Sequence, residues 1–194
     1  MSYIFNSVAD ASMMMILVVF CFCDVLSGVV FQKDWNKDEW YMKGAKKVWL
    51  IPVWWVFPVV WTVLYVMIIS SLYIFYRSVT QTGDYGQTVD VITLLFIFNM
   101  FLNKLWSPVF FRYRSPITAW FICAGILATG IAMLYFFGAN DYNDSCWIFL
   151  PYVIWTAFAL VLNTFWIWKN KAIKKEKQQS ATDNTTMMNE KSLY

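Results

Sequence analysis

The stretch ITAWFICAGILATGIAMLYFFG, residues 117–138, decides the fold, because it has the length of a membrane-crossing helix and no charged side chain. A bilayer core of roughly 30 Å takes about 20 apolar residues in helical form. Four further stretches have similar length and character, at about residues 11–31, 49–76, 91–111 and 147–168. None alternates polar and apolar residues, as the strands of a membrane barrel do. We therefore predict an all-α membrane protein, with one domain of five transmembrane helices over residues 1–168.

The overall composition of the 194 residues agrees with a membrane protein and excludes several enzyme classes. The chain is 60% hydrophobic and 14% charged, against roughly 45–50% and roughly 25% in soluble domains. The absence of histidine excludes Ser-His-Asp triads and His-ligated zinc or haem. The four cysteines show no CxxC spacing, so we expect no disulfide framework and no metal site. We expect no required cofactor and no nucleic-acid partner.

The distribution of basic residues predicts the orientation. Thirteen of the fifteen Lys and Arg lie in the loop after the first span, the loop after the third span and the C-terminal tail. Arg77 is the one basic residue on the opposite side, and Lys104 lies inside the third span. The positive-inside rule then places the C-terminus in the cytosol and the N-terminus outside. Residues 169–194 are basic and polar with little apolar content, so we expect a disordered cytosolic tail.

The usual belt of tryptophans at the membrane interface accounts for most of the 12 tryptophans, but not for Trp61, Trp106 and Trp155. At 1.5 Å per residue, Trp61 lies about 18 Å from the cytosolic end of its helix and Trp155 about 12 Å from the far end of its own. These depths coincide in a core of roughly 30 Å. The two indoles would either flank a flat aromatic ligand or pack within the bundle, and the residues alone leave both interpretations open.

Polar residues at membrane depth form a second group. The third span contains Asn99, Asn103 and Lys104, which should face protein rather than lipid. Asp24 and Lys104 each lie seven residues before the cytosolic end of their spans, about 10 Å below that surface. We therefore predict a structural ion pair between Asp24 and Lys104; a polar pocket floor and a snorkelling lysine are the alternatives.

Three ordered blocks of sequence resemble one protein family. They are PVWWVFPVVWTVLY at residues 52–65, NKLWSPVFF at residues 103–111 and LPYVIWTAFALVLN at residues 150–163. They are similar to the second-, third- and fifth-helix signatures of the translocator protein family. This family is also called the tryptophan-rich sensory proteins or peripheral benzodiazepine receptors (TspO/MBR).

The resemblance implies a five-helix bundle, often a homodimer, whose pocket opens toward the cytosol. The pocket of such proteins takes porphyrins, haem, sterols or benzodiazepine-type ligands. A eukaryotic member would lie in the mitochondrial outer membrane and other members in other cellular membranes. Carried over by position, the ligand-binding residues would be Pro58, Val60, Trp61, Asn103, Trp106, Trp155, Ala159 and Leu162.

Three positions depart from the family pattern. Thr164 stands where the sterol motif requires tyrosine, so that motif gives no support for sterol recognition. Val53 replaces the second proline of the usual pair, and Lys104 occupies a position that is usually apolar.

Our leading hypothesis is therefore a membrane receptor or carrier for tetrapyrroles, porphyrin or haem, or for similar flat hydrophobic molecules, with sterols left open as ligands. The alternatives are a porphyrin-degrading enzyme, with Trp61 and Trp155 as redox partners, and a stress-signalling adaptor that acts through its first loop and tail.

Overall fold

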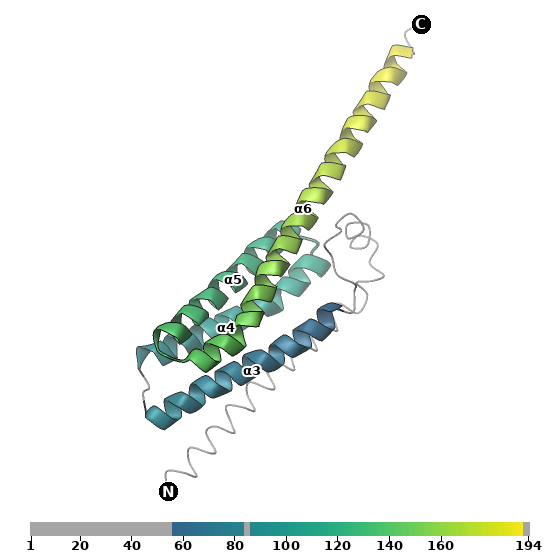
Figure 1. The fold of residues 1–194 in the computed structure, drawn as a ribbon. Helices are drawn as coiled ribbons and strands as arrows, with labels where there is room; N and C mark the ends of the chain where they lie inside the picture. The colour runs from purple at the N-terminus through teal and green to yellow at the C-terminus, as the bar shows by residue number, and fades with distance from the viewer. Residues whose placement is uncertain (1–55, 84–85, 192–194) are drawn as a thin grey trace.

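The computed structural model describes residues 56–83 and 86–191, with only the helix path given for most of the chain beyond Lys171 (Figure 1). These ranges contain no strand. They form the helices α3 (Val56–Thr82), α4 (Gln87–Ser107), α5 (Pro116–Ala139) and α6 (Asn143–Lys191), with a π-helical turn, η1 (Pro108–Arg112), after α4. The first predicted span, residues 11–31, lies outside the described residues. The five-helix count and the positions of both termini therefore stay predictions.

Four of the predicted spans correspond to helices long and apolar enough to cross a membrane, at Val59–Thr82, Gln87–Arg112, Pro116–Ala139 and Asn143–Lys171. Their outward faces carry large apolar side chains. Val63, Leu94 and Phe121 are all more than half exposed, as expected for a surface covered by lipid rather than water. The chain is thus an integral, multi-pass membrane protein.

The helix α3 continues to Thr82, six residues past the end expected from hydropathy. Its last turn is polar, but Thr80 and Thr82 donate hydrogen bonds to the carbonyls of Tyr76 and Ser78, at 2.7 and 3.0 Å. Gly83, with φ of +70°, then ends the helix and donates its N–H to the Val79 carbonyl. A left-handed glycine is the usual helix stop, whereas hydropathy reports only where apolar character ends.

The tail differs from the expected disorder, because α6 continues without a break from Asn143 to Lys191 (Figure 1). In the figure, this yellow-green end extends beyond the other labelled helices. Neither glycine nor proline follows Pro151, and Lys, Glu, Gln and Ala are good helix formers. Low apolar content therefore limits what the segment can bury but does not prevent it from being helical.

Within the described residues, α5 packs against α4 and α6, and α3 packs against α6. The side chains between these helices form a dense core toward the α3–α4 and α5–α6 turns, which we call the packed half. Phe75, Phe137 and Phe149 are fully buried there. The Phe137 ring lies 5.4 Å from that of Phe75 and 5.9 Å from that of Phe149, both edge to face.

A polar network crosses the bundle at the edge of the packed half. The Asn99 amide nitrogen donates to the Ile126 carbonyl at 2.8 Å and to the Thr129 hydroxyl at 2.7 Å. The Tyr152 hydroxyl donates to Asn99 Oδ1 and accepts from the Asn103 amide at 3.1 Å. As expected for polar groups at membrane depth, Asn99 and Asn103 face protein. The network links α4, α5 and α6, so it holds these helices in one register.

The described basic residues collect at one end of the bundle. Arg112 and Arg114 lie in the connection between α4 and α5, and Lys169 and Lys171 closely follow Trp166 of α6, whose ring meets that of Phe110 in η1 at 5.4 Å. Arg77, near the opposite end, is exposed. This asymmetry underlies the predicted cytosolic orientation of that end.

Candidate ligand cavity between the helices

A cavity lies between the helices beyond the polar network, in the part of the bundle that we call the hollow half. It holds about 80 Å³ of free space for the centres of water-sized spheres, where one ordered water needs roughly 10–15 Å³ on the same measure. The described lining comes from all four helices and η1: Phe57, Trp61, Asn103, Trp106, Phe110, Phe111, Cys123, Ile126, Trp155, Thr156, Ala159, Leu162, Asn163 and Trp166.

The π-helical turn η1 builds one end of the cavity. The Tyr113 N–H bonds the Pro108 carbonyl at 3.0 Å, five residues back. In this wide turn the consecutive residues Phe110 and Phe111 are both buried and both line the cavity. The Phe110 ring stacks on Trp106 at 5.1 Å between centroids and meets Trp166 edge to face at 5.4 Å. Single π turns inside helices are frequent at functional sites, and here the turn supplies an aromatic wall.

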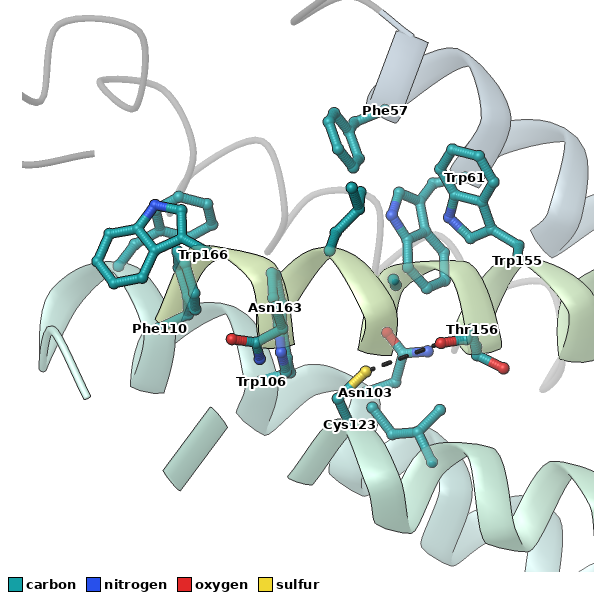
Figure 2. Close-up of a pocket in the computed structure, with 14 residues that line it drawn as sticks. Phe57, Trp61, Asn103, Trp106, Phe110, Cys123, Trp155, Thr156, Asn163 and Trp166 are labelled. Atoms are coloured by element: carbon teal, nitrogen blue, oxygen red, sulfur yellow. Dashed lines mark hydrogen bonds between the residues drawn. The ribbon is translucent and has the colours of Figure 1, made fainter. Parts of the chain in front are cut away.

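The opposite end is formed by Trp61 and Phe57 of α3 and by Trp155 of α6 (Figure 2). The Phe57 and Trp155 rings meet edge to face at 6.0 Å. The Trp61 ring meets Tyr152 in the same way at 6.4 Å. Because Tyr152 belongs to the polar network, this end of the cavity lies next to the packed half. The two ends together present flat apolar faces and ring edges to whatever lies between them.

Six of the eight residues carried over from the family line this cavity, namely Trp61, Asn103, Trp106, Trp155, Ala159 and Leu162. Val60 is not among the described lining residues; like its neighbour Trp61, it is partly buried against the main hydrophobic cluster. The side chain of Pro58 lies outside the described residues. Asp24 also lies outside the described residues, so its ion pair with Lys104 stays a prediction. Lys104 is half-buried near the end of α4 and is not among the described lining residues.

Several polar atoms of the lining have no hydrogen-bond partner within the described part of the chain. They are the indole nitrogens of Trp106 and Trp155 and both amide atoms of Asn163. Other polar groups are engaged: the Thr156 hydroxyl donates to the Val153 carbonyl at 2.9 Å, and Asn103 belongs to the network. A buried polar group without a partner is uncommon in native proteins. The described chain also has unpaired buried hydroxyls at Ser107 and Ser145, which are not among the lining residues, so the gathering of several such atoms on one cavity is what marks the site.

Asn163 was not selected as a site residue by sequence reasoning, although it closes the third of the family-like blocks. It is 3% exposed and lies in the cavity wall on α6. The signal that could have found it is the one that selected Asn99 and Asn103, a polar side chain inside an apolar span.

The chain resembles a group of known membrane proteins. The TspO/MBR family model matches residues 14–169. The tryptophan-rich protein TspO of Chlorobaculum tepidum is 32% identical over 125 residues, which cover 64% of this chain and 76% of that protein. The tryptophan-rich sensory protein of Cereibacter sphaeroides is 32% identical over 127 residues, 65% of this chain and 73% of that protein.

A more distant relative is the translocator protein of Bos taurus, at 25% identity over 139 residues, 71% of this chain and 78% of that protein. The family match includes most of the first predicted span as well as the four described helices. From this match across most of its length, the chain belongs to the TspO/MBR family.

Proposed function

We propose that this protein is a membrane receptor or carrier that binds a tetrapyrrole, porphyrin or haem, or a similar flat hydrophobic molecule, in the cavity of the hollow half. The observation that carries the proposal is the lining itself. Aromatic rings form both ends of a hollow inside the bundle, and two of its indoles, Trp106 and Trp155, have N–H groups without a described partner. A flat aromatic ligand would offer faces to the rings and acceptors to the N–H groups.

Apolar burial would provide most of the affinity. Each Å² of apolar surface removed from water contributes about 25 cal/mol before ordering costs are subtracted. A large planar ring system buries more such surface per rotatable bond than a flexible chain, which lowers the ordering cost. We therefore expect the cavity to bind rigid, flat molecules more tightly than acyl chains.

The position of Thr164 gives no support for sterol recognition at the end of α6. Its side chain is exposed on the outer face, where the hydroxyl accepts a hydrogen bond from the Trp120 indole at 2.7 Å and donates to the Leu160 carbonyl at 2.8 Å. Thr164 is thus engaged with the protein and lies away from the cavity lining. The proposal is therefore made for tetrapyrroles and similar flat molecules, and the end of α6 adds no argument for a sterol.

Receptor and carrier both remain in the proposal, because the names of the relatives point to each. The protein of Cereibacter sphaeroides is called sensory and that of Bos taurus a translocator. A homodimer, which the family implies, belongs to the same proposal; the mass of the detergent-purified protein by light scattering would test it.

Quenching of tryptophan fluorescence tests whether a tetrapyrrole binds in the cavity. The full chain in detergent is titrated with protoporphyrin, beside a Trp61→Phe, Trp155→Phe double variant. We expect saturable quenching at micromolar ligand in the wild type and at least tenfold weaker binding in the variant, since about 1.4 kcal/mol of lost contact has that effect. A Trp147→Phe, Trp168→Phe double variant is the matched control, because these two indoles are 70% and 60% exposed and lie outside the cavity.

Three outcomes separate the hypotheses. Saturable binding that only the cavity variant loses supports the proposal. Linear quenching that is identical in all three proteins contradicts it and redirects attention to the loops and tail. Running the titration in light and in darkness tests the enzyme alternative, because a receptor or carrier returns its ligand unchanged, whereas light-dependent loss of porphyrin absorbance would show conversion.

A further inference from the structure

The amide of Asn163 is the most unusual polar group of the described cavity. The side chain is 3% exposed, and neither Nδ2 nor Oδ1 has a partner within the described chain. Asn99, buried in the same bundle, has both of its amide atoms bonded. A buried amide normally satisfies its donor and acceptor because leaving them unpaired is unfavourable. Asn163 therefore has the chemistry of a group that finds its partners on a ligand.

The location of Asn163 fits such a role. It lies along α6 between Trp155 and Trp166, about 12 Å from Trp155 and about 4.5 Å from Trp166 along the helix axis. Figure 2 shows it between the two aromatic ends of the cavity. Trp106, whose indole N–H also lacks a partner in the described chain, belongs to the same lining. A flat molecule held by both aromatic ends would therefore pass Asn163.

The unpaired atoms restrict the group that can bind there. Nδ2 of Asn163 and Nε1 of Trp106 are donors, whereas Oδ1 of Asn163 is an acceptor. A complementary group must accept and donate together, as a carboxamide, a lactam or a hydroxyl does. An ionised carboxylate can only accept, so it would leave Oδ1 unpaired and place a second negative oxygen near it.

The charge of the described lining residues also favours a neutral partner over a carboxylate. None of the described lining residues is charged, so a carboxylate beside Asn163 would be buried without a described counter-ion. Burying an unpaired ion is far more unfavourable than burying a neutral group that forms hydrogen bonds. The cavity wall at this point therefore favours a neutral partner.

We propose that Asn163, together with the indole N–H of Trp106, is a hydrogen-bonding anchor that selects flat ligands carrying a neutral group with both a donor and an acceptor. This inference rests on the proposed function, because it assigns a specificity to the same cavity. It adds that the polar end of the ligand recognised at Asn163 is an amide, lactam or hydroxyl rather than a carboxylate.

A series of three porphyrins with one ring system tests the anchor: mesoporphyrin as its diamide, its dimethyl ester and its free diacid. The amide arms donate and accept, the ester arms only accept, and the diacid arms are charged. We expect the wild type in detergent to bind the diamide at least about tenfold more tightly than the dimethyl ester, because the ester leaves Oδ1 unpaired. In an Asn163→Leu variant, whose branched side chain has as many heavy atoms but no hydrogen-bonding group, this ratio should fall to about one.

The outcomes separate the anchor from the cavity. If the diamide and the ester bind the wild type equally, or if Asn163→Leu keeps the preference, the anchor is refuted while the cavity remains a binding site. If the diacid binds most tightly and Asn163→Leu removes that advantage, the site takes a carboxylate and the inference is wrong. If no porphyrin binds saturably, the proposed function fails first and the anchor with it.

Thermal unfolding without ligand gives a second readout. Asn163→Leu should unfold at the wild-type temperature or above, because it removes an unpaired buried amide. Asn99→Leu, the matched control, should unfold at a lower temperature because it leaves the Tyr152 hydroxyl and Thr129 without their partner. Equal destabilisation by the two substitutions would show that Asn163 is bonded within the protein, which would overturn the inference.

Discussion

Asn99 and Asn163 carry the same side chain, buried to 0% and 3% exposure in one bundle, yet their surroundings are opposite. In the packed half, Asn99 joins α4 to α5 and α6 through bonds to Ile126, Thr129 and Tyr152. In the hollow half, Asn163 has no described partner. The packed half thus satisfies its buried amide internally, which suits a scaffold, whereas the hollow half leaves one for another molecule, which suits a site.

Small residues on α5 account for part of this difference. A methyl group on Gly130 would lie 3.2 Å from Val153 Cγ2, and one on Gly125 would lie 3.0 Å from Leu102 Cδ1. These glycines therefore let α5 approach α6 and α4 closely beside the polar network. Around the cavity, by contrast, the lining is dominated by large rings from α3, η1 and α6.

The largest effect is expected from Phe137→Ala in the packed half. The Phe137 side chain is fully buried between the rings of Phe75 and Phe149. Its truncation should lower the free energy of unfolding by about 3–5 kcal/mol, the usual range for a buried aromatic replaced by alanine. Unfolding in mixed micelles followed by circular dichroism measures it. A loss below about 1 kcal/mol would show that this half is not closely packed.

Tyr152→Phe tests the boundary between the halves. The substitution keeps the ring but removes the hydroxyl that donates to Asn99 and accepts from Asn103. We expect the free energy of unfolding to fall by about 1–2 kcal/mol, because the buried Asn99 amide and the half-buried Asn103 amide each lose a partner, and interhelical bonds in membranes rarely exceed that value. The same micelle unfolding measures the change. A variant as stable as the wild type would mean that the network does not hold the helices together.

Ala159→Leu should separate binding from stability in the hollow half. Ala159 is a small residue of the cavity wall, so a larger side chain would occupy space that the proposed ligand needs. We expect protoporphyrin affinity to fall at least tenfold, or about 1.4 kcal/mol, while the free energy of unfolding changes by less than about 1 kcal/mol. Fluorescence titration and unfolding on one preparation measure both. Unchanged affinity would place the ligand elsewhere.

The smallest change in the free energy of unfolding is expected from replacing either of two glycines of α5 with alanine. Gly138 has nothing within 4 Å of the place of an added methyl group, whereas Gly130 has Val153 at 3.2 Å. Gly138→Ala should stabilise the protein by up to about 1 kcal/mol through helix propensity. Gly130→Ala should be less stable than Gly138→Ala by about 1 kcal/mol in the same assay. An equal gain at both positions would argue against tight α5–α6 contact.

The amino-acid sequence predicts the described spans well, because the membrane requires runs of about 20 apolar residues and such runs are local. It predicts helix ends less well. Gly83 and the hydroxyls of Thr80 and Thr82, rather than hydropathy, decide where α3 stops. It also misses the helical continuation of α6 to Lys191. Low apolar content limits how much surface a segment can bury, but helix propensity is a separate property.

The candidate site was predictable as a set of residues but not as a geometry. Depth along the helices and the family resemblance both select Trp61 and Trp155, and the structure places both on one cavity. The same reasoning includes Val60, which is not among the described lining residues. Position along a helix does not tell which side of the chain faces the cavity; that depends on the rotation of each helix against its neighbours.

By itself, the sequence determined the class of protein, the described membrane spans and the family, because hydrophobicity, charge distribution and motif spacing are properties of the chain. Only the tertiary structure decided which polar groups pair. Whether an amide is bonded depends on what the neighbouring helices bring within about 3 Å of it. Tyr152, Ile126 and Thr129 come that close to Asn99, and within the described chain nothing comes that close to Asn163.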